Sequence, residues 1–300
     1  MSNPLISVIM STYNESRAEL RKSVESILNQ SYSNIQVVII NDNPRNVETK
    51  EYLETVQDHR VEIYTNDKNV GLVASLNRAL SYTRGEFIAR MDADDIAELC
   101  RIEKQLQYLC SKNLDMVGCD ICLIDVEDRV VKRRMHFPES NQKVKKYIAW
   151  GSCLAHPTWL VKREVYQTLN GYRNVPYCED YDFLLRVIAM PEYKVGNAPI
   201  IGLKYRIRDN SLSASNNVRQ YVLRRYLSKN RDRISALSSE SINKYIISKE
   251  FIGEIQICEM YFQIRNKCRK TPLLLLHLPF NKYFYYRLFE NIVLLLRNQA

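Results

Sequence analysis

The sequence predicts an α/β protein whose first half forms a mainly parallel sheet flanked by helices. Apolar runs typical of buried strands alternate four times with helical patterns within about 110 residues, and such alternation is typical of parallel sheets covered by helices. In addition, 46% of the 300 residues are hydrophobic and 26% are charged. This is the composition of a globular protein that is long enough for a sizeable core.

The elements of the first half follow from the spacing of its apolar residues. The predicted strands are residues 5–10, 35–40, 61–64 and 86–91. The pattern after the first strand is helical, because it places Leu20, Val24 and Ile27 on one face. Further helices are expected near residues 46–57 and from Leu72 onward.

The pattern changes beyond residue 115. Two strands are predicted within residues 116–137, on either side of a polar turn. A helix is predicted at residues 139–149, a strand at 157–161 and a helix at 181–189. Beyond about residue 215 the chain is expected to be wholly helical.

An acidic turn follows the strand at residues 86–91, with Asp92, Asp94 and Asp95 within four positions. In open α/β sheets, ligands bind just outside the carboxyl ends of strands. Clustered carboxylates are costly unless a cation neutralises them, and Mg²⁺ or Mn²⁺ binds carboxylate and phosphate oxygens together. The turn therefore indicates a metal that also holds a diphosphate. The alternative is a solvated turn that caps the next helix.

Composition narrows the cellular setting. No apolar signal region follows the N-terminus and no run approaches the ~20 apolar residues of a membrane span, so a cytoplasmic protein is expected. Eight cysteines in such a chain do not predict a disulfide framework. Cys119 and Cys122 form a lone Cys-x-x-Cys in an apolar run, which we interpret as buried free thiols and not as a metal site.

The net charge of +9 is concentrated in the last third of the chain. Residues 1–200 carry 25 Lys and Arg against 27 Asp and Glu, whereas residues 201–300 carry 18 against 7. This asymmetry favours an anionic partner for the C-terminal part: a membrane surface, nucleic acid or an anionic substrate.

Several motifs in order resemble the family-two, inverting glycosyltransferases with the GT-A fold. They are Ser7–Glu15, Ser26–Tyr32, Asn69–Ala79, Gly85–Asp95, His156–Thr158, Gly171-Tyr172 and Glu179–Arg186. Each motif is weak alone, but their order and spacing over residues 4–210 support kinship. The resemblance implies a Rossmann-like, mixed GT-A sheet flanked by helices. Residues 1–114 would be its nucleotide-binding half, 115–212 its acceptor-side half, and 213–300 a basic helical extension.

The chain departs from the family at three places. Asn41–Pro44 has one acid where the family usually has two acids and Gly-Ser, and Glu98–Arg101 lacks the proline that commonly follows the acidic turn. The Gln-x-x-Arg-Trp box of processive relatives such as cellulose synthases is absent. The last departure favours transfer of a single sugar.

The resemblance also implies catalytic roles. Asp94 would hold Mn²⁺ or Mg²⁺, with Asp92 contacting the metal or the ribose, and the ion would stabilise the leaving diphosphate. Asp95 would support the metal site or cap the following helix. Asp180 would deprotonate the acceptor hydroxyl, with Glu179 beside it. The alternative is that both acids only favour a helix N-terminus.

Further residues are expected at the nucleotide-sugar. Thr12, Tyr13 and Glu15 follow the first strand, where the family holds the base and ribose, and Tyr13 would stack on uracil. Asp42 would accept a hydrogen bond from the base, although ordinary turn chemistry is the alternative for Thr12 and Asp42.

Three basic residues are weaker candidates for the same ligand. Arg78 and Arg90 are expected at the phosphates, with surface charge as the alternative. His156 is expected near the diphosphate or the acceptor, with a structural role as the alternative.

The C-terminal tail combines apolar runs at residues 273–276 and 292–296 with aromatic and basic residues between them. This pattern suits a helix on an anionic bilayer, which predicts a peripheral position at the inner face of the cell membrane. The alternative is packing on the catalytic domain or on a second subunit. No nucleic-acid-binding module is recognised, so nucleic acid is not expected as a partner.

The expected protein is a metal-dependent hexosyl- or N-acetylhexosaminyl-transferase of bacterial surface-polysaccharide synthesis. Its donor would be UDP-linked and its acceptor a glycan or a lipid-linked glycan. Two alternatives remain. One is a sugar nucleotidylyltransferase, although that class needs a glycine-rich loop that Ser11–Glu15 lacks. The other is a catalytically silent nucleotide-sugar-binding or scaffold protein, because fold does not guarantee function.

Overall fold

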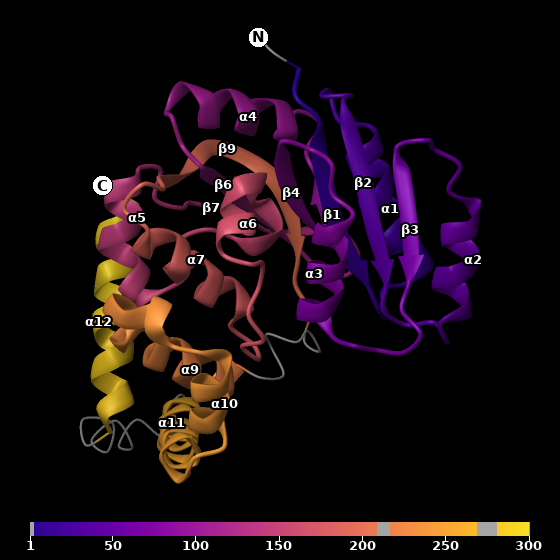
Figure 1. The fold of residues 1–300 in the computed structure, drawn as a ribbon. Helices are drawn as coiled ribbons and strands as arrows, with labels where there is room; N and C mark the ends of the chain where they lie inside the picture. Colours follow the sequence, from indigo (N-terminus) through magenta and orange to yellow (C-terminus); the bar gives the residue numbers. More distant parts are fainter. Residues whose placement is uncertain (1–2, 209–216, 269–280, 300) are drawn as a thin grey trace. The chain divides into compact units, whose positions relative to one another are not determined.

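The computed structural model describes residues 3–208, 217–268 and 281–299 (Figure 1). Within these residues, nine strands form one mixed sheet in the order β3-β2-β1-β4-β8-β6-β9-β5, and β7 pairs with β6. The strands are β1 (Ile6–Thr12), β2 (Ile35–Asn41), β3 (Val61–Thr65), β4 (Phe87–Asp92), β5 (Ile96–Ala97), β6 (Met116–Ile124), β7 (Val130–Met135), β8 (Leu160–Lys162) and β9 (Val195–Arg206).

The chain groups into two compact units. Unit 1 comprises Met1–Val144, Cys153–Asn174 and Met190–Arg208, and unit 2 comprises Lys145–Ser152, Val175–Ala189 and Asp209–Ala300. The sheet lies in unit 1. The domain boundary expected at residue 212 stays a prediction.

The helices complete the two units. In unit 1 they are α1 (Arg17–Leu28), α2 (Val47–Thr55), α3 (Leu72–Ser81), α4 (Arg101–Ser111) and α6 (Arg163–Thr168), with the 3₁₀ helix η2 (His156–Thr158). In unit 2 they are η1 (Ile148–Trp150), α7 (Glu179–Ala189), α9 (Asn217–Lys229), η3 (Arg231–Ala236), α10 (Ser239–Ile246), α11 (Lys249–Cys268) and α12 (Lys282–Gln299). Helix α5 (Asn141–Tyr147) includes the boundary.

Strands β3, β2, β1 and β4 are mutually parallel, as predicted. Ser11 of β1 lies opposite Ile40 of β2 on one side and opposite Asp92 of β4 on the other. The carboxyl ends of these strands therefore meet at one edge of the sheet, where α/β proteins bind ligands.

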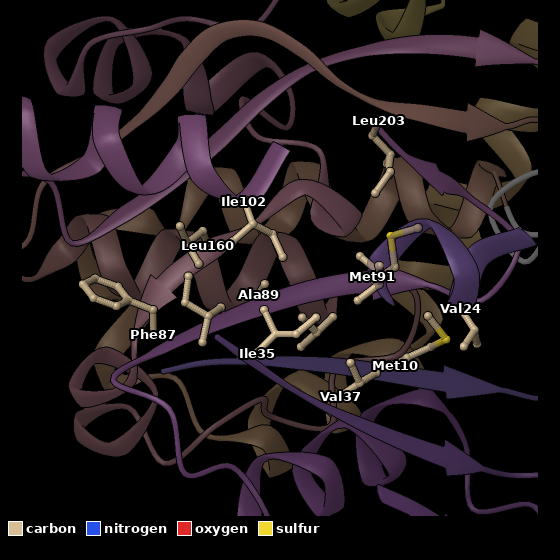
Figure 2. Close-up of a cluster of buried hydrophobic side chains, with 14 of the residues drawn as sticks. Met10, Val24, Ile35, Val37, Phe87, Ala89, Met91, Ile102, Leu160 and Leu203 are labelled. Atoms are coloured by element: carbon tan, nitrogen blue, oxygen red, sulfur yellow. The ribbon is translucent and has the colours of Figure 1, made fainter. Parts of the chain in front are cut away.

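The core of unit 1 is formed where helices cover this sheet. Figure 2 shows Val37, Ala89 and Met91 from the strands together with Val24 from α1. Helix α1 begins at a capping box, in which Ser16 accepts from the Glu19 N–H and the Glu19 side chain binds the Ser16 backbone N–H. Burying one such aliphatic side chain contributes about 1.5–3 kcal/mol, so the apolar stripe holds α1 on the sheet.

In the second half one prediction was wrong and one strand was not predicted. Residues 157–161 are not one strand, because η2 precedes the three-residue β8. Pro157 lacks a backbone N–H for a sheet, and the Thr158 hydroxyl donates to the Ala155 carbonyl at 2.7 Å, which closes a turn. Strand β9 was missed altogether, because Gly196, Pro199 and Gly202 interrupt its apolar pattern.

Strand β9 nevertheless links β6 to the short strand β5 at one end of the sheet. It pairs parallel with β6, with register shifts near Asp120, and antiparallel with β5. The shifts lie opposite Pro199 and its neighbours, as expected where a proline interrupts a ladder. The predicted burial of Cys119 and Cys122 as free thiols is confirmed.

The described residues of unit 2 are mainly helical, as predicted for its C-terminal part, and α9 packs against α11. Tyr283 of α12 is buried, and its hydroxyl donates to Glu254 Oε2 of α11 at 2.6 Å. Tyr285, Leu288 and Phe289 are exposed. No helix in the described part of the chain is both long and apolar enough to cross a bilayer. Membrane contact stays a prediction, and residues 273–276 lie outside the described residues.

Candidate active site

The acidic turn lies at the carboxyl end of β4. Asp92 ends the strand, and Asp94 and Asp95 lie in the turn that leads to β5. One carboxylate oxygen from each of the three residues lies within 4.8 Å of the other two. The Ser23 hydroxyl donates to the Asp92 carbonyl at 2.7 Å, which ties the turn to α1. The turn therefore presents three hard oxygen ligands at one point of the sheet edge.

The acids suit a divalent cation. Oδ2 of Asp95 is buried and has no hydrogen-bond partner, which is costly for a carboxylate unless a cation compensates it. Burial and the neighbouring Asp92 carboxylate raise the pKa of Asp94 to about 7. Burial raises the pKa of Asp95 well above its usual value, and the negative charges of Asp92 and Asp94 raise it further. Oxygen ligands of this kind are those that Mg²⁺ and Mn²⁺ prefer.

The end of β9 supplies two arginines that the sequence prediction missed. The Arg206 N–H donates to Asp95 Oδ1 at 2.8 Å, and its Nε donates to the Asp94 carbonyl at 2.9 Å. Nη2 of Arg208 lies 3.0 Å from Asp94 Oδ2 and 3.1 Å from Glu19 Oε1. The sequence does contain an Arg-x-Arg at residues 206–208. Its position beside the acidic turn can be inferred only after β9 has been recognised as a strand.

Asp95 does not cap the following helix, so that alternative is wrong. Helix α4 begins at Arg101 with Cys100 as its N-cap, and no side chain caps it. Asp95 is instead buried and anchors the β9 backbone. Arg90, also buried, pairs with Asp92, so it is not a surface charge.

The turn after β1 is organised by Glu15. Its Oε2 accepts from the Thr12 hydroxyl at 2.6 Å and from the Tyr13 N–H at 2.7 Å. Tyr13 is 42% exposed. Thr12 and Glu15 thus hold the loop, while the Tyr13 ring is open to solvent. Their contact with a nucleotide stays a prediction.

Asp42 connects the ends of β2 and β3 to α3. Its Oδ1 accepts from Asn66 Nδ2 at 2.7 Å and from the Val70 N–H at 2.9 Å, and its Oδ2 accepts from the Gly71 N–H at 2.9 Å. Gly71 has a φ of +87°, which favours glycine. Arg78 donates to the Thr65 carbonyl at 3.0 Å in the same loop. These contacts hold the loop, and the roles of Asp42 and Arg78 toward a nucleotide stay predictions.

His156 lies in a buried aromatic cluster. Its Nε2 is 2.9 Å from the Tyr172 hydroxyl, which is 3.0 Å from the Tyr166 hydroxyl. Its ring also tilts against Trp159 at 4.5 Å. Burial, with the Arg90 charge adding, holds the pKa of His156 well below its usual value, so the ring is neutral. Its expected contact with substrate stays a prediction.

Asp180 and Glu179 open helix α7 in unit 2. Asp180 Oδ1 accepts from the N–H of the next residue, Tyr181, at 2.6 Å. The neighbouring Asp182 is buried and pairs with Arg186 at 3.0 Å. Asp180 lines a cavity of about 420 Å³ within unit 2. This helix end therefore carries a buried, ion-paired acid, Asp182, and an acid that lines the cavity, Asp180.

Comparison with known proteins extends these observations. The sequence model described as glycosyl transferase family 2 matches residues 7–192. The chain is 34% identical over 233 residues to the O-antigen biosynthesis glycosyltransferase WbnJ of Escherichia coli, which covers 75% of this chain and 90% of WbnJ. Residues 7–192, which the family model matches, contain the acidic turn and the Glu179-Asp180 pair.

Two solved structures share the fold. S. aureus TarS in complex with UDP-GlcNAc has a TM-score of 0.59 at 15% identity, covering 87% of this chain and 80% of that one. Mannosyltransferase PcManGT from Pyrobaculum calidifontis, in complex with GDP-Man and Mn²⁺, has a TM-score of 0.57 at 16% identity, covering 98% and 85%. The predicted GT-A fold is thus confirmed. The family model matches more than half of the residues of this chain. The chain therefore belongs to glycosyl transferase family 2.

Proposed function

We propose that this glycosyltransferase moves one hexosyl or N-acetylhexosaminyl group from a UDP-sugar to a glycan or lipid-linked glycan, with inversion and with help from Mn²⁺ or Mg²⁺. The three carboxylate oxygens within 4.8 Å at the end of β4 carry the proposal. The name of WbnJ supports a role in surface-polysaccharide biosynthesis. The TarS complex supports UDP as the donor nucleotide, and the PcManGT complex makes GDP the first alternative.

In this proposal Asp94 and Asp92 hold the metal ion. When bound, the ion supplies Lewis-acid stabilisation of the leaving diphosphate. Asp95 and Arg206 keep the turn in place through their 2.8 Å hydrogen bond, and Arg90 orients Asp92 through their ion pair. The side chains would thus be positioned before the donor arrives, which spares reorganisation during the reaction.

The loops at the same sheet edge would bind the nucleotide. The exposed ring of Tyr13 stacks on the base, while Thr12 and Glu15 fix the loop that presents it. Asp42 accepts from the base through the remaining lone pair of Oδ2, which already accepts from one N–H. Arg78 and His156 are assigned to the diphosphate side.

Asp180 is the proposed base. The acceptor hydroxyl transfers its proton to the Asp180 carboxylate, and the oxygen attacks the anomeric carbon. The bond from that carbon to the diphosphate oxygen breaks on the opposite face, so the configuration inverts. Glu179 stands beside the base at the start of α7. The proposed location is the cytoplasm, at the inner face of the cell membrane.

Calorimetric titration of UDP, with and without Mn²⁺, tests the donor site. We expect Mn²⁺-dependent binding to the wild-type protein and its loss in Asp94→Ala. Asp232→Ala is the control, because the Asp232 side chain is 90% exposed. If UDP fails, GDP-, dTDP- and CMP-linked donors are titrated next. Failure of all four nucleotides would overturn the proposal.

Turnover separates the enzyme from its alternatives. We expect labelled UDP-sugar to be consumed by the wild-type protein in the presence of acceptor. A protein that binds UDP-sugar but never turns it over would be a silent binding or scaffold protein. Release of a nucleoside triphosphate from UDP-sugar and pyrophosphate would identify a nucleotidylyltransferase instead.

A further inference from the structure

The cavity beside Asp180 lies within unit 2, and residues of helices α7, α9, α11 and α12 line it. Besides Asp180 of α7, its lining includes Tyr221 and Arg224 of α9, Phe262 of α11 and Arg287 of α12. The last four residues lie beyond residue 192, where the family match ends. The cavity therefore joins a residue from the matched segment to residues from this chain's own C-terminal helices.

Two arginines at this cavity share one carboxylate. Arg224 Nη2 lies 3.1 Å from Glu290 Oε1, and Arg287 Nη1 lies 3.0 Å from Glu290 Oε2. The Glu290 side chain is only 3% exposed, so a buried carboxylate holds both arginines in place. Arg224 is held further by a 3.1 Å hydrogen bond from its Nη1 to the Trp150 carbonyl. Glu290 offsets the charge of one guanidinium, so the two arginines and Glu290 together carry one positive charge beside the cavity that Asp180 also lines.

The aromatic residues hold this charge in position. The guanidinium carbons of Arg224 and Arg287 lie 5.2 Å and 5.1 Å from the centre of the Tyr221 ring. Arg287 also lies 5.8 Å from the centre of the Phe262 ring. Such cation–π contacts fix a guanidinium without using its N–H donors. The arginines therefore keep donors for a further partner.

Unused hydrogen-bonding groups also point to a ligand. Nε of Arg287 and the hydroxyl of Tyr221 are buried and have no hydrogen-bond partner. A buried donor left without a partner is costly. Aromatic walls with a few convergent polar groups are typical of ligand cavities, and guanidinium groups bind phosphate and carboxylate in preference to neutral groups.

We propose that this cavity binds the acceptor through an anionic group, which Arg224 and Arg287 hold beside Asp180. The inference rests on the proposed role of Asp180 as the base. The anion is a phosphate or a carboxylate, because both match the planar guanidinium donors. It comes either from the phosphate that links a glycan to a lipid or from an acidic sugar of the glycan. The residues beyond position 192 thereby select the acceptor.

Calorimetric binding of three probes tests the proposal on the full-length protein. The probes are a short prenyl diphosphate-linked N-acetylglucosamine, an alkyl glucuronide, and a neutral alkyl N-acetylglucosaminide. We expect one anionic probe to bind at least about tenfold more tightly than the neutral one. Arg224→Gln and Arg287→Gln are expected to remove that preference, and Arg219→Gln, an exposed change on the same helix, is expected to keep it.

A double variant distinguishes loss of the anion contact from loss of the fold. Removing Arg287 alone changes the net charge of the Arg224–Glu290–Arg287 network from +1 to zero, whereas Arg287→Gln combined with Glu290→Gln keeps it at +1. We expect this double variant to remain folded and still to lose at least about tenfold in affinity for the anionic probe. Arg287→Lys is expected to recover part of the affinity, since it restores the charge but not the fork of donors.

Each outcome bears on the proposal. Preference for the prenyl diphosphate identifies a lipid-linked acceptor, and preference for the glucuronide identifies an acidic sugar. Equal binding of neutral and anionic probes, equal losses in Arg219→Gln, or no binding of any probe would overturn it. UDP binding with Mn²⁺ is measured on the same preparations. Its absence, with anionic preference intact, would reject the proposed donor reaction and retain the anion site.

Discussion

Nη2 of Arg208 lies 3.0 Å from Oδ2 of Asp94, the carboxylate to which we assign the metal. The same nitrogen lies 3.1 Å from Glu19 Oε1, so the arginine bridges the acidic turn and helix α1. A guanidinium and a divalent cation are alternative partners of one carboxylate oxygen. If Asp94 holds the metal as proposed, Arg208 would compete with the metal for this carboxylate until a diphosphate offered the arginine a new partner.

Replacing Arg208 is expected to strengthen metal binding when no nucleotide is present. In Arg208→Gln the competing charge is gone, so Mn²⁺ affinity should rise about two- to fivefold, the range for a partly exposed ion pair. Calorimetric titration of Mn²⁺ measures this change. Arg208→Lys should remain near wild type, and Arg133→Gln, an exposed change elsewhere, should have no effect. A lower Mn²⁺ affinity in Arg208→Gln would contradict the competition.

Metal affinity is expected to rise with pH. Burial and the Asp92 charge raise the pKa of Asp94 to about 7, and a carboxylate must lose its proton before it binds a metal. Mn²⁺ affinity should therefore increase between about pH 6 and 8, with proton release that titration in two buffers detects. Asp94→Asn should abolish the proton release. A pH-independent affinity would show that Asp94 is not a ligand.

The same shift sets a pH dependence of stability in the metal-free protein. The Asp94 pKa in the fold, about 7, exceeds the unfolded value of ~3.9, so the folded state binds more protons between these values. Stability due to Asp94 is complete below the unfolded pKa and is lost as pH rises toward 7. Thermal unfolding should show this decline, and Mn²⁺ should reverse it. No decline in the wild type relative to Asp94→Asn would refute this linkage.

Much of unit 1 was predictable because it obeys local patterns. The four parallel strands and their helices appear with ends shifted by one or two residues, since buried strands and amphipathic helices leave a periodic signal. The position of Asp92 at the carboxyl end of β4 followed from the same pattern. Strand β9 was not predictable, because Gly196 and Pro199 break its pattern and β6 holds it through pairing far along the chain.

The site shows the same division between local and distant contacts. The acidic turn is a local motif, but Arg208 meets Asp94 only because β9 ends beside it. Likewise, Asp42 was visible as a turn acid, whereas its bonds to Val70 and Gly71 join residues 28 and 29 positions apart. No spacing rule within one sequence predicts such contacts, because they depend on how the strands are ordered.

Removing the Asp42 carboxylate is expected to destabilise the loop between β3 and α3. In Asp42→Ala the N–H groups of Val70 and Gly71 lose their acceptor, at a cost of about 1–3 kcal/mol for partly buried donors. Urea unfolding should show this loss, together with weaker UDP binding. Asp42→Asn keeps one acceptor and should lose less. Asp67→Ala, an exposed change in the same loop, should stay near wild type.

Asp180→Asn distinguishes catalysis from helix stabilisation. Asparagine keeps an acceptor for the Tyr181 N–H, which the aspartate binds at 2.6 Å, but it cannot take the proton of a hydroxyl. If Asp180 is the base, turnover should fall about 10²–10⁴-fold while UDP binding is kept. If the acid only favours the N-terminus of α7, stability should fall by about 0.3–1 kcal/mol and turnover should persist.

Asp182→Asn provides the matched comparison on the same helix turn. Asp182 is buried and pairs with Arg186 at 3.0 Å, so neutralising it removes a buried ion pair and should cost about 3–5 kcal/mol of stability. The two variants should therefore separate: Asp180→Asn lowers the rate at nearly constant unfolding midpoint, and Asp182→Asn lowers the midpoint. Equal effects on both measurements would assign Asp180 to the structure of α7 and leave the base to be sought elsewhere.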